Sequence, residues 1–242
     1  MKRALAAILA DGLLLAAGID AQAAYLSAAP AVATPAPTAS PTPSPIESRL
    51  LAVPVYYQAY ALSCEEAALR MALAYEGIQA TDAQILALIG IDWSAATYDS
   101  SGLRWGDPYT AFVGNPGGSE VNLSGYGTYY PNIARAAAAL GANVLQAGEG
   151  IVPTEVYSAV LAGHPVVAWV TYQWVGAQRT DYVAFDGRAI PYAGPVEHAI
   201  TVAGVTATTV DVNDPDFGQY QVSKSVFEAS YATYNQMAVV LA

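Results

Sequence analysis

Apolar residues recur at helical spacing through the first half of the folded part of the chain. Between Ser63 and Gly77 they occupy positions 67, 68, 71, 72 and 75, which lie on one face of a helix. Ser63 and Glu66 form a capping-box pattern at the start of this helix, and Gly77 ends it. Similar start and stop signals predict further helices over residues 81–90, 131–141, 154–163 and 223–231.

Runs of β-branched and aromatic residues dominate the second half. They predict strands over residues 165–174, 198–205, 208–213, 218–222 and 237–241. Residues 51–58 read as a short extended segment that Pro54 keeps irregular or at a sheet edge. Helices followed by a run of strands predict an α+β fold, with N-terminal helices packed on a C-terminal antiparallel sheet.

The N-terminal region differs in composition from the rest. Residues 1–23 combine Lys2 and Arg3 with an apolar stretch and a small-residue cleavage pattern, which predicts an export signal. The other interpretation of this stretch is an uncleaved anchor. Residues 24–48 hold six of the fifteen prolines and predict a disordered linker rich in Pro, Ala, Thr and Ser. We therefore expect one folded domain over residues 49–242 and a secreted or surface-tethered, extracytoplasmic protein.

Composition and charge exclude several classes of partner. The chain has 54% hydrophobic residues, enough for a full-sized core, and a net charge of −11 with only nine Lys and Arg. Nucleic-acid binding depends on clustered basic side chains, so this balance argues against it and against an electrostatic hold on anionic lipid. Apart from the N-terminal segment, the sequence predicts no membrane-spanning stretch.

Cys64 is the only cysteine, and it stands at the start of the first predicted helix. A lone thiol is a buried hydrophobe, an intermolecular link or a nucleophile. A helix N-terminus lowers the pKa of a thiol through its free N–H groups and aligned dipoles. Glu65 and Glu66 oppose this effect, so a thiolate here needs a positive partner.

His198 is the candidate for that partner. An imidazolium can pair with the thiolate and later protonate a leaving amine. Asp214 follows one predicted hairpin later, where antiparallel pairing would let its carboxylate accept the Nδ1–H of His198. Gln58, six residues before Cys64, could donate its amide N–H to an oxyanion. His164 lies in a helix-to-strand turn and is interpreted as structural.

The sequence predicts neither a metal nor a cofactor. One cysteine and two histidines without a His-x-x-x-His spacing supply few nitrogen or sulfur ligands for zinc. No glycine-rich phosphate loop of the Walker or dinucleotide type is present in the sequence.

Two blocks of the chain resemble a known family. The first runs from Val53-Pro54 through Gln58 to Ser63-Cys64-Glu65-x-Ala67-Ala68-Leu69-x-Met71-Ala72-Leu73-x-Tyr75-x-Gly77, and the second joins Glu197-His198-Ala199 to Val210-Asp211-Val212-Asn213-Asp214-Pro215. Together they resemble the bacteriocin-processing, double-glycine peptidase-like cysteine peptidases, a papain-like group, and above all its stand-alone exported members.

This resemblance implies a papain-like fold and a peptide or protein substrate. It implies Cys64 as nucleophile, His198 as general base and acid, Asp214 as its orienting group and Gln58 in the oxyanion hole. The segment 91–130, rich in Gly and Tyr, is additional to the minimal pattern, and we expect it to cover or line the substrate groove. Its Gly117-Gly118 pair is interpreted as a turn.

Three functions follow as hypotheses. The first is an exported cysteine peptidase that hydrolyses peptide bonds through an acyl-enzyme. The second is a non-catalytic peptide-binding module of the same fold, displayed on a stalk. The third is a wall-directed amidase, which the sequence disfavours because Cys64 lacks the Asp-Cys-Ser-Gly context of such enzymes.

Overall fold

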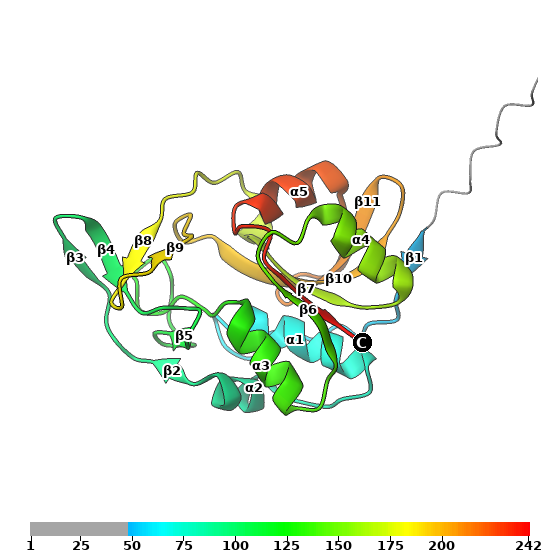
Figure 1. Cartoon of the computed structure of the whole chain (residues 1–242), viewed down its shortest axis with the longest axis horizontal. Helices are drawn as coiled ribbons and strands as arrows, with labels where there is room; N and C mark the ends of the chain where they lie inside the picture. Colours follow the sequence, from blue (N-terminus) through cyan, green and yellow to red (C-terminus); the bar gives the residue numbers. More distant parts are fainter. Residues whose placement is uncertain (1–47) are drawn as a thin grey trace, which may run out of the picture. The chain divides into compact units, whose positions relative to one another are not determined.

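A computed structural model describes residues 48–242. The predicted export signal and nearly all of the predicted linker therefore lie outside the described residues. Five α-helices form within the described part (Figure 1): α1 Cys64–Tyr75, α2 Asp82–Ile89, α3 Tyr130–Ala139, α4 Pro153–Ala162 and α5 Lys224–Ala232. A single 3-10 turn, Tyr172–Trp174, follows one of the strands.

A seven-stranded antiparallel sheet forms the centre of the fold. Its strands follow the order β12-β11-β10-β7-β13-β6, and β1 pairs with β10 beside this path. Their bounds are β1 Arg49–Leu50, β6 Val144–Gly148, β7 Val166–Thr171, β10 Glu197–Val205, β11 Thr209–Asp214, β12 Gly218–Ser223 and β13 Ala238–Leu241. The helices α1, α2 and α3 lie on one side of these strands, and α4 and α5 lie on the other (Figure 1). The α+β fold predicted from the sequence is confirmed.

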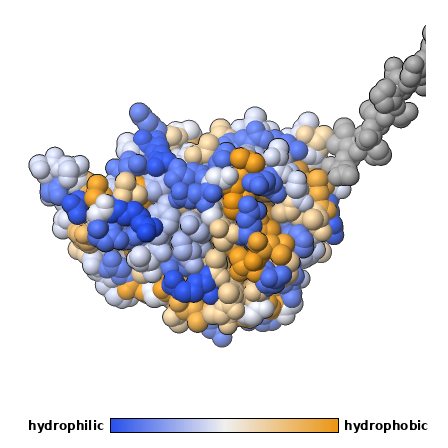
Figure 2. All heavy atoms as spheres, in the orientation of Figure 1, coloured by the Kyte–Doolittle hydropathy of each residue, from blue (hydrophilic) through white to orange (hydrophobic). Residues whose placement is uncertain are grey.

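Two small sheets build the part of the chain that lacked periodicity. The parallel pair β2 Ile91–Asp92 and β5 Phe112–Val113 forms one, and β3 Thr97–Asp99, β4 Gly102–Trp105, β8 Tyr182–Ala184 and β9 Ala189–Ile190 form the other. Hydrophilic residues predominate around this second sheet on the face shown in Figure 2, and hydrophobic ones gather in a band nearer the central sheet. The expected turn at Gly117-Gly118 is present, closed by the Gly118 N–H, which donates to the Asn115 carbonyl at 2.8 Å.

Local sequence signals explain most helix ends. At α2, the Thr81 hydroxyl accepts from the Gln84 N–H at 3.2 Å, and the Gln84 side chain accepts from the Thr81 N–H at 2.9 Å, which completes a capping box. Gly163 ends α4 with a φ of 108°, a left-handed conformation that glycine adopts without strain. Among the helices of residues 48–242, none combines the length and hydropathy that a bilayer crossing requires.

The capping box predicted for α1 is wrong. The Ser63 hydroxyl accepts from the Tyr60 N–H at 3.0 Å and donates to Asp82 Oδ2 at 3.1 Å, so it faces away from the helix. Glu66, its predicted partner, is completely buried, and both its carboxylate oxygens have no hydrogen-bond partner within the described residues. The Ser63 hydroxyl therefore binds the carboxylate of Asp82, at the start of α2, instead of an N–H group of α1. This hydrogen bond links the two helices.

The contact that positions α1 is its packing on β10. The Thr201 hydroxyl, buried in β10, donates to the Ala68 carbonyl of α1 at 2.8 Å. On the neighbouring strand β7, the buried Trp169 donates its Nε1–H to the Thr128 carbonyl at 3.0 Å. These bonds hold α1 and the loop before α3 against the same region of the sheet.

Thr201→Val is expected to lower the free energy of unfolding by about 1 kcal/mol, because it removes one buried hydrogen bond while keeping the side-chain shape. Urea denaturation measures this difference. Thr208→Val, at an exposed position in the β10–β11 turn, is the matched control and should change stability by less than about 0.5 kcal/mol. Equal effects of the two substitutions would contradict the role given to the α1–β10 hydrogen bond.

Candidate active site

Cys64, His198 and Gln58 line one cavity of about 190 Å³. Cys64 is the first residue of α1, His198 is the second residue of β10, and Gln58 lies in the loop before α1. Asp214 ends β11 beside them. The structure thus brings together the four residues singled out from the sequence.

Strand register places His198 and Asp214 together. Thr201 pairs with Asn213, so Ile200 lies opposite Asp214, and His198 lies two residues before it on the same face. The imidazole Nε2 is 3.0 Å from Asp214 Oδ1. The sequence analysis expected Nδ1 at this place, and the structure corrects that expectation.

Asp214 is held in its ionised form. Burial alone would raise the pKa of this carboxyl group, but the hydrogen bond and charge of His198 outweigh burial and lower the pKa. The Asp216 N–H donates to Oδ1 at 2.8 Å, and the Tyr220 hydroxyl donates to Oδ2 at 2.8 Å. In a neutral imidazole, this acceptor at Nε2 favours the tautomer with the proton on Nε2, and Nδ1 then has the lone pair that a general base needs.

Aromatic rings fix the plane of the imidazole. The ring of Tyr172, from the 3-10 turn after β7, meets His198 edge-on with centroids 5.2 Å apart and an interplanar angle of 89°. Phe217 packs against Tyr172 in turn, with centroids 5.6 Å apart. Sequence analysis missed both residues, because a turn and a loop far apart in the chain supply them.

Gln58 lines the cavity, and one hydrogen of its side-chain amide takes part in a hydrogen bond. Its Nε2 donates to the Ala61 carbonyl at 2.9 Å, which leaves the second amide hydrogen free of that bond. Its backbone N–H donates to the Pro215 carbonyl at 3.1 Å, directly after Asp214. The loop that carries Gln58 is therefore tied to the end of β11, which positions its amide with respect to the histidine pair.

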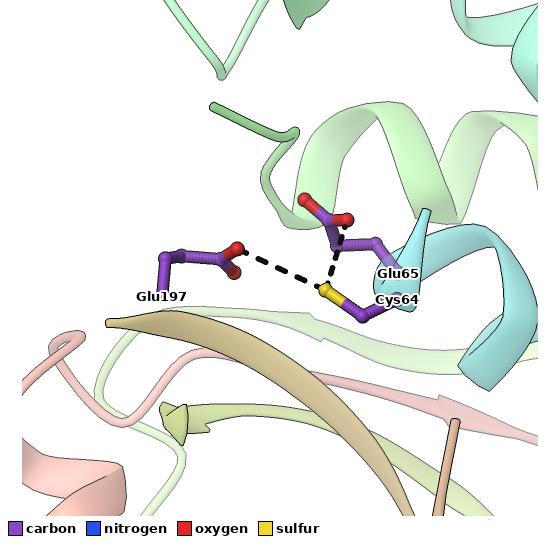
Figure 3. A group of neighbouring side chains, drawn as sticks. All are labelled: Cys64, Glu65 and Glu197. Carbon is purple, nitrogen blue, oxygen red and sulfur yellow. Dashed lines mark hydrogen bonds between the residues drawn. The ribbon is translucent and has the colours of Figure 1, made fainter. Parts of the chain in front are cut away.

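The thiol is surrounded by carboxyl groups. Cys64 Sγ lies 3.3 Å from Glu65 Oε2 and 3.9 Å from Glu197 Oε2 (Figure 3). Within residues 48–242 no hydrogen bond joins Sγ to His198, although the thiol lies against β10 on both sides of that residue, at Glu197 and at the Ala199 backbone. The sequence predicted that Glu65 would oppose a thiolate at Cys64, but it gave Glu197 only as part of a motif, so the approach of Glu197 to the thiol was not foreseen.

These surroundings raise the pKa of the Cys64 thiol well above its ordinary value. Burial is the main cause, and the negative charges of Glu65 and Glu197 add to it. The lowered pKa expected from the helix N-terminus is therefore not found. Burial also raises the pKa of Glu65 to about 7, and it raises the pKa of Glu197 well above the ordinary range.

The segment 91–130 supplies one wall of the cavity. Ser119, Glu120, Val121 and Tyr126 line it, opposite Tyr172 and Pro195. Glu120 is buried, and its Oε2 accepts the Glu197 N–H at 3.3 Å, which positions Glu197 at the start of β10. His164, in contrast, lies in the turn between α4 and β7 and lines a separate depression.

Comparison with known proteins places this geometry in a family. The model of the Peptidase_C39 like family matches residues 50–239. The chain belongs to the Peptidase_C39 like family. This membership confirms the resemblance drawn from the Cys64 and His198 blocks.

Three solved structures are similar to this chain to different degrees. A protein described as a C39-like peptidase from Bacillus anthracis is 25% identical, with a TM-score of 0.66, and the match covers 81% of this chain and 98% of that one. The double-glycine motif protease of an AMS/PCAT transporter, solved with a leader peptide, is 16% identical with a TM-score of 0.45, over 79% and 91% of the two chains.

The peptidase domain of Streptococcus ComA, a bi-functional ABC transporter, is 14% identical with a TM-score of 0.47, over 78% of this chain and 98% of that one. A comparison with curated proteins gave no match.

The ionised state of Asp214 predicts a pH-dependent stability difference. A carboxyl group whose folded pKa is lowered stabilises the fold above its unfolded pKa of about 3.9, and this stabilisation disappears as the pH falls through the folded pKa. Asp214→Asn should therefore cost about 1–2 kcal/mol at pH 7 and progressively less below about pH 4. Urea denaturation across this range measures the difference.

Tyr220→Phe, which removes one donor to Asp214, serves as the graded control and should show the same trend at smaller amplitude. A difference between wild type and Asp214→Asn that stays constant or widens on acidification would show that Asp214 is not held ionised by its partners.

Proposed function

We propose that this C39-family protein is a cysteine-type peptidase that hydrolyses peptide bonds through an acyl-enzyme on Cys64. The observation that carries this proposal is the cavity that Cys64, His198 and Gln58 line together, with the His198–Asp214 pair at 3.0 Å behind it. Family membership supports a peptide as the substrate.

The geometry supports general-base activation of a neutral thiol. Because the pKa of the thiol is raised, the thiolate is not the resting form, and Nδ1 of His198 takes the proton as sulfur attacks the substrate carbonyl. The C–N bond then breaks as the imidazolium returns this proton to the leaving amine. A water molecule, activated by the same Nδ1, hydrolyses the thioester and releases the acid and free Sγ–H.

Two donors suit the oxyanion of the tetrahedral intermediate. The backbone N–H of Cys64 belongs to the first turn of α1, whose N–H groups have no partner inside the helix. The free amide hydrogen of Gln58 is the second donor. Both residues line the cavity, so neither donor requires a rearrangement of the fold.

The second candidate is a peptide-binding module without catalysis. The specific observation that favours it is that Sγ contacts Glu65 and Glu197, whereas no hydrogen bond within residues 48–242 joins it to His198. A binding module would retain peptide affinity after Cys64→Ala with no turnover in the wild type, so the experiment below separates the two candidates.

We also propose that the domain acts outside the cytoplasm, supported by the export pattern of residues 1–23. N-terminal sequencing of protein recovered from the medium and from the cell surface tests this location. An intact N-terminus on cytoplasmic protein would contradict it.

Cys64→Ala and His198→Ala should each abolish hydrolysis of a peptide library, with losses of at least about 10⁴-fold, because each removes a group that forms or breaks bonds. Mass spectrometry of the library with a metal chelator and reductant present measures turnover. His164→Ala, which removes the only other histidine, is the matched control and should retain wild-type activity. If the wild type and Cys64→Ala produce the same fragments, the peptidase proposal is wrong.

Gln58→Ala should lower kcat by about 10²–10³-fold with a small change in KM, because an oxyanion donor acts only in the transition state. Steady-state kinetics on the best peptide of the library measures both constants. Gln58→Glu keeps the size of the side chain but loses the amide donor, so it should behave like the alanine variant. A loss confined to KM would instead assign Gln58 to substrate binding.

A further inference from the structure

Three ligand atoms converge at one point beside the cavity. Cys64 Sγ and carboxylate oxygens of Glu65 and Glu197 all lie within 4.8 Å of one another. The three side chains come from the start of α1 and the start of β10 and point toward each other (Figure 3). Sequence analysis argued against a metal by counting nitrogen and sulfur ligands, and it could not foresee that two glutamates would meet the thiol.

The spacing of these atoms matches a tetrahedral metal site. A zinc ion with bonds of about 2.3 Å to sulfur and about 2.0 Å to oxygen separates those two ligand atoms by about 3.5 Å. The observed separations from Sγ are 3.3 Å to Glu65 and 3.9 Å to Glu197, on either side of that value. The two carboxylate oxygens lie within 4.8 Å of each other, so all three ligand atoms surround one point.

An unsatisfied oxygen points to a missing cation. Glu197 is 4% exposed, and its Oε1 has no hydrogen-bond partner within residues 48–242. Buried carboxylates are normally paired with a cation or fully hydrogen-bonded. The arginines and the lysine of residues 48–242 do not supply one, because each contacts a group elsewhere in the fold: Arg49, Arg70, Arg104, Arg135, Arg179, Arg188 and Lys224.

The backbone leaves room for the two carboxylates to approach. A Cβ on Gly127 would collide with Glu65 Oε1 and lie 3.1 Å from Glu197 Oε2. The next N–H, of Thr128, donates to Glu65 Oε1, and Glu120 accepts the Glu197 N–H. Outer partners of this kind orient metal ligands. Cys64 and Glu197 line the cavity of about 190 Å³, which provides an access path and space for a fourth ligand.

We propose that Cys64, Glu65 and Glu197 form a binding site for one thiophilic divalent metal ion, of the Zn²⁺ class, on the sulfur of the nucleophile. Binding releases to solvent the proton on Sγ and any proton that the two carboxyl groups hold, and the ion neutralises the thiolate and carboxylates that remain. Where the protein acts as the peptidase proposed above, the ion occupies the sulfur lone pair that would attack the substrate, and it holds the enzyme inactive until it is removed.

Cadmium titration of the full chain tests the site without reference to activity. Cd²⁺ replaces zinc at such ligands, and its bond to a thiolate gives an ultraviolet charge-transfer band. We expect one Cd²⁺ per chain with this band in the wild type, and no band in Cys64→Ser. Cd²⁺ bound without the band, or no binding, would overturn the proposal.

Paired glutamate variants sharpen the test. Glu65→Gln and Glu197→Gln should each weaken Cd²⁺ binding by more than about tenfold, the loss that removal of even an outer partner causes. Glu66→Gln, adjacent in sequence and equally buried, is the matched control and should bind as the wild type does. An equal loss in all three variants would indicate a general charge effect and overturn the assigned ligands.

Gly127→Ala tests the site even if the glutamate variants misfold. It keeps all three ligands, but its added Cβ crowds the carboxylate oxygens of Glu65 and Glu197. It should lower Cd²⁺ affinity while Cys64 alkylation by iodoacetamide without metal proceeds as in the wild type. Unchanged affinity would contradict the site. If the protein hydrolyses peptides in a Cys64-dependent way but does not bind Cd²⁺, the metal site is refuted and the peptidase proposal stands. If it binds Cd²⁺ but hydrolyses no peptide in the presence of chelator, the peptidase proposal is refuted and the metal site stands.

Discussion

The packing of α1 on β10 is the constraint on which the site depends. It brings the first residue of a helix against the first residues of a strand more than a hundred residues later in the chain. Thr201 and Ala68 fix this contact inside the core, one turn beyond Cys64. Because the helix start and the strand start are held by the same contact, the thiol, the imidazole and two glutamates keep a common geometry without support from a flexible loop.

This packing has an electrostatic cost that the site shows directly. Glu65, Glu197 and Glu120 are buried beside the thiol, and none of the lysines and arginines of residues 48–242 lines their cavity. The N–H groups of the α1 N-terminus and of Thr128 offset part of this cost. Because these N–H groups offset only part of the cost of burial, the carboxyl groups and sulfur keep their protons, as the raised pKa values of Glu197 and Cys64 indicate.

Short-range sequence patterns predicted those features of the fold that depend on residues close together in the chain. The start of α1 at Cys64, the extent of α2 and the alternation that places Asp214 on the face of His198 all follow from short-range spacing. The sequence did not predict the strand β6. It also did not predict the strands of the two small sheets, because strands of two to four residues are too short to show a hydrophobic period. The parallel pairing of β4 with β8 joins residues about eighty positions apart, for which no local signal exists.

The errors at the site have the same origin. Ser63 satisfied every local rule for a capping box, yet Asp82 of the next helix accepted its hydroxyl. The helix-dipole argument for a low thiol pKa was sound for an isolated helix, but it omitted Glu197, which reaches Sγ from β10. A sequence pattern reports which groups are near along the chain, and the charge around a buried thiol is decided by groups that are near only in the fold.

The carboxylates therefore have opposite effects on the two chemistries that Cys64 can support. For acyl transfer they are a hindrance, since burial beside Glu65 and Glu197 keeps the proton on Sγ, and in the proposed mechanism His198 removes this proton as the new bond forms. For a divalent cation the same charges are ligands, and the cation deprotonates sulfur without help from a base. A peptidase alone gives no physical reason to bury Glu65 and Glu197 against its nucleophile, whereas a metal-controlled thiol requires both.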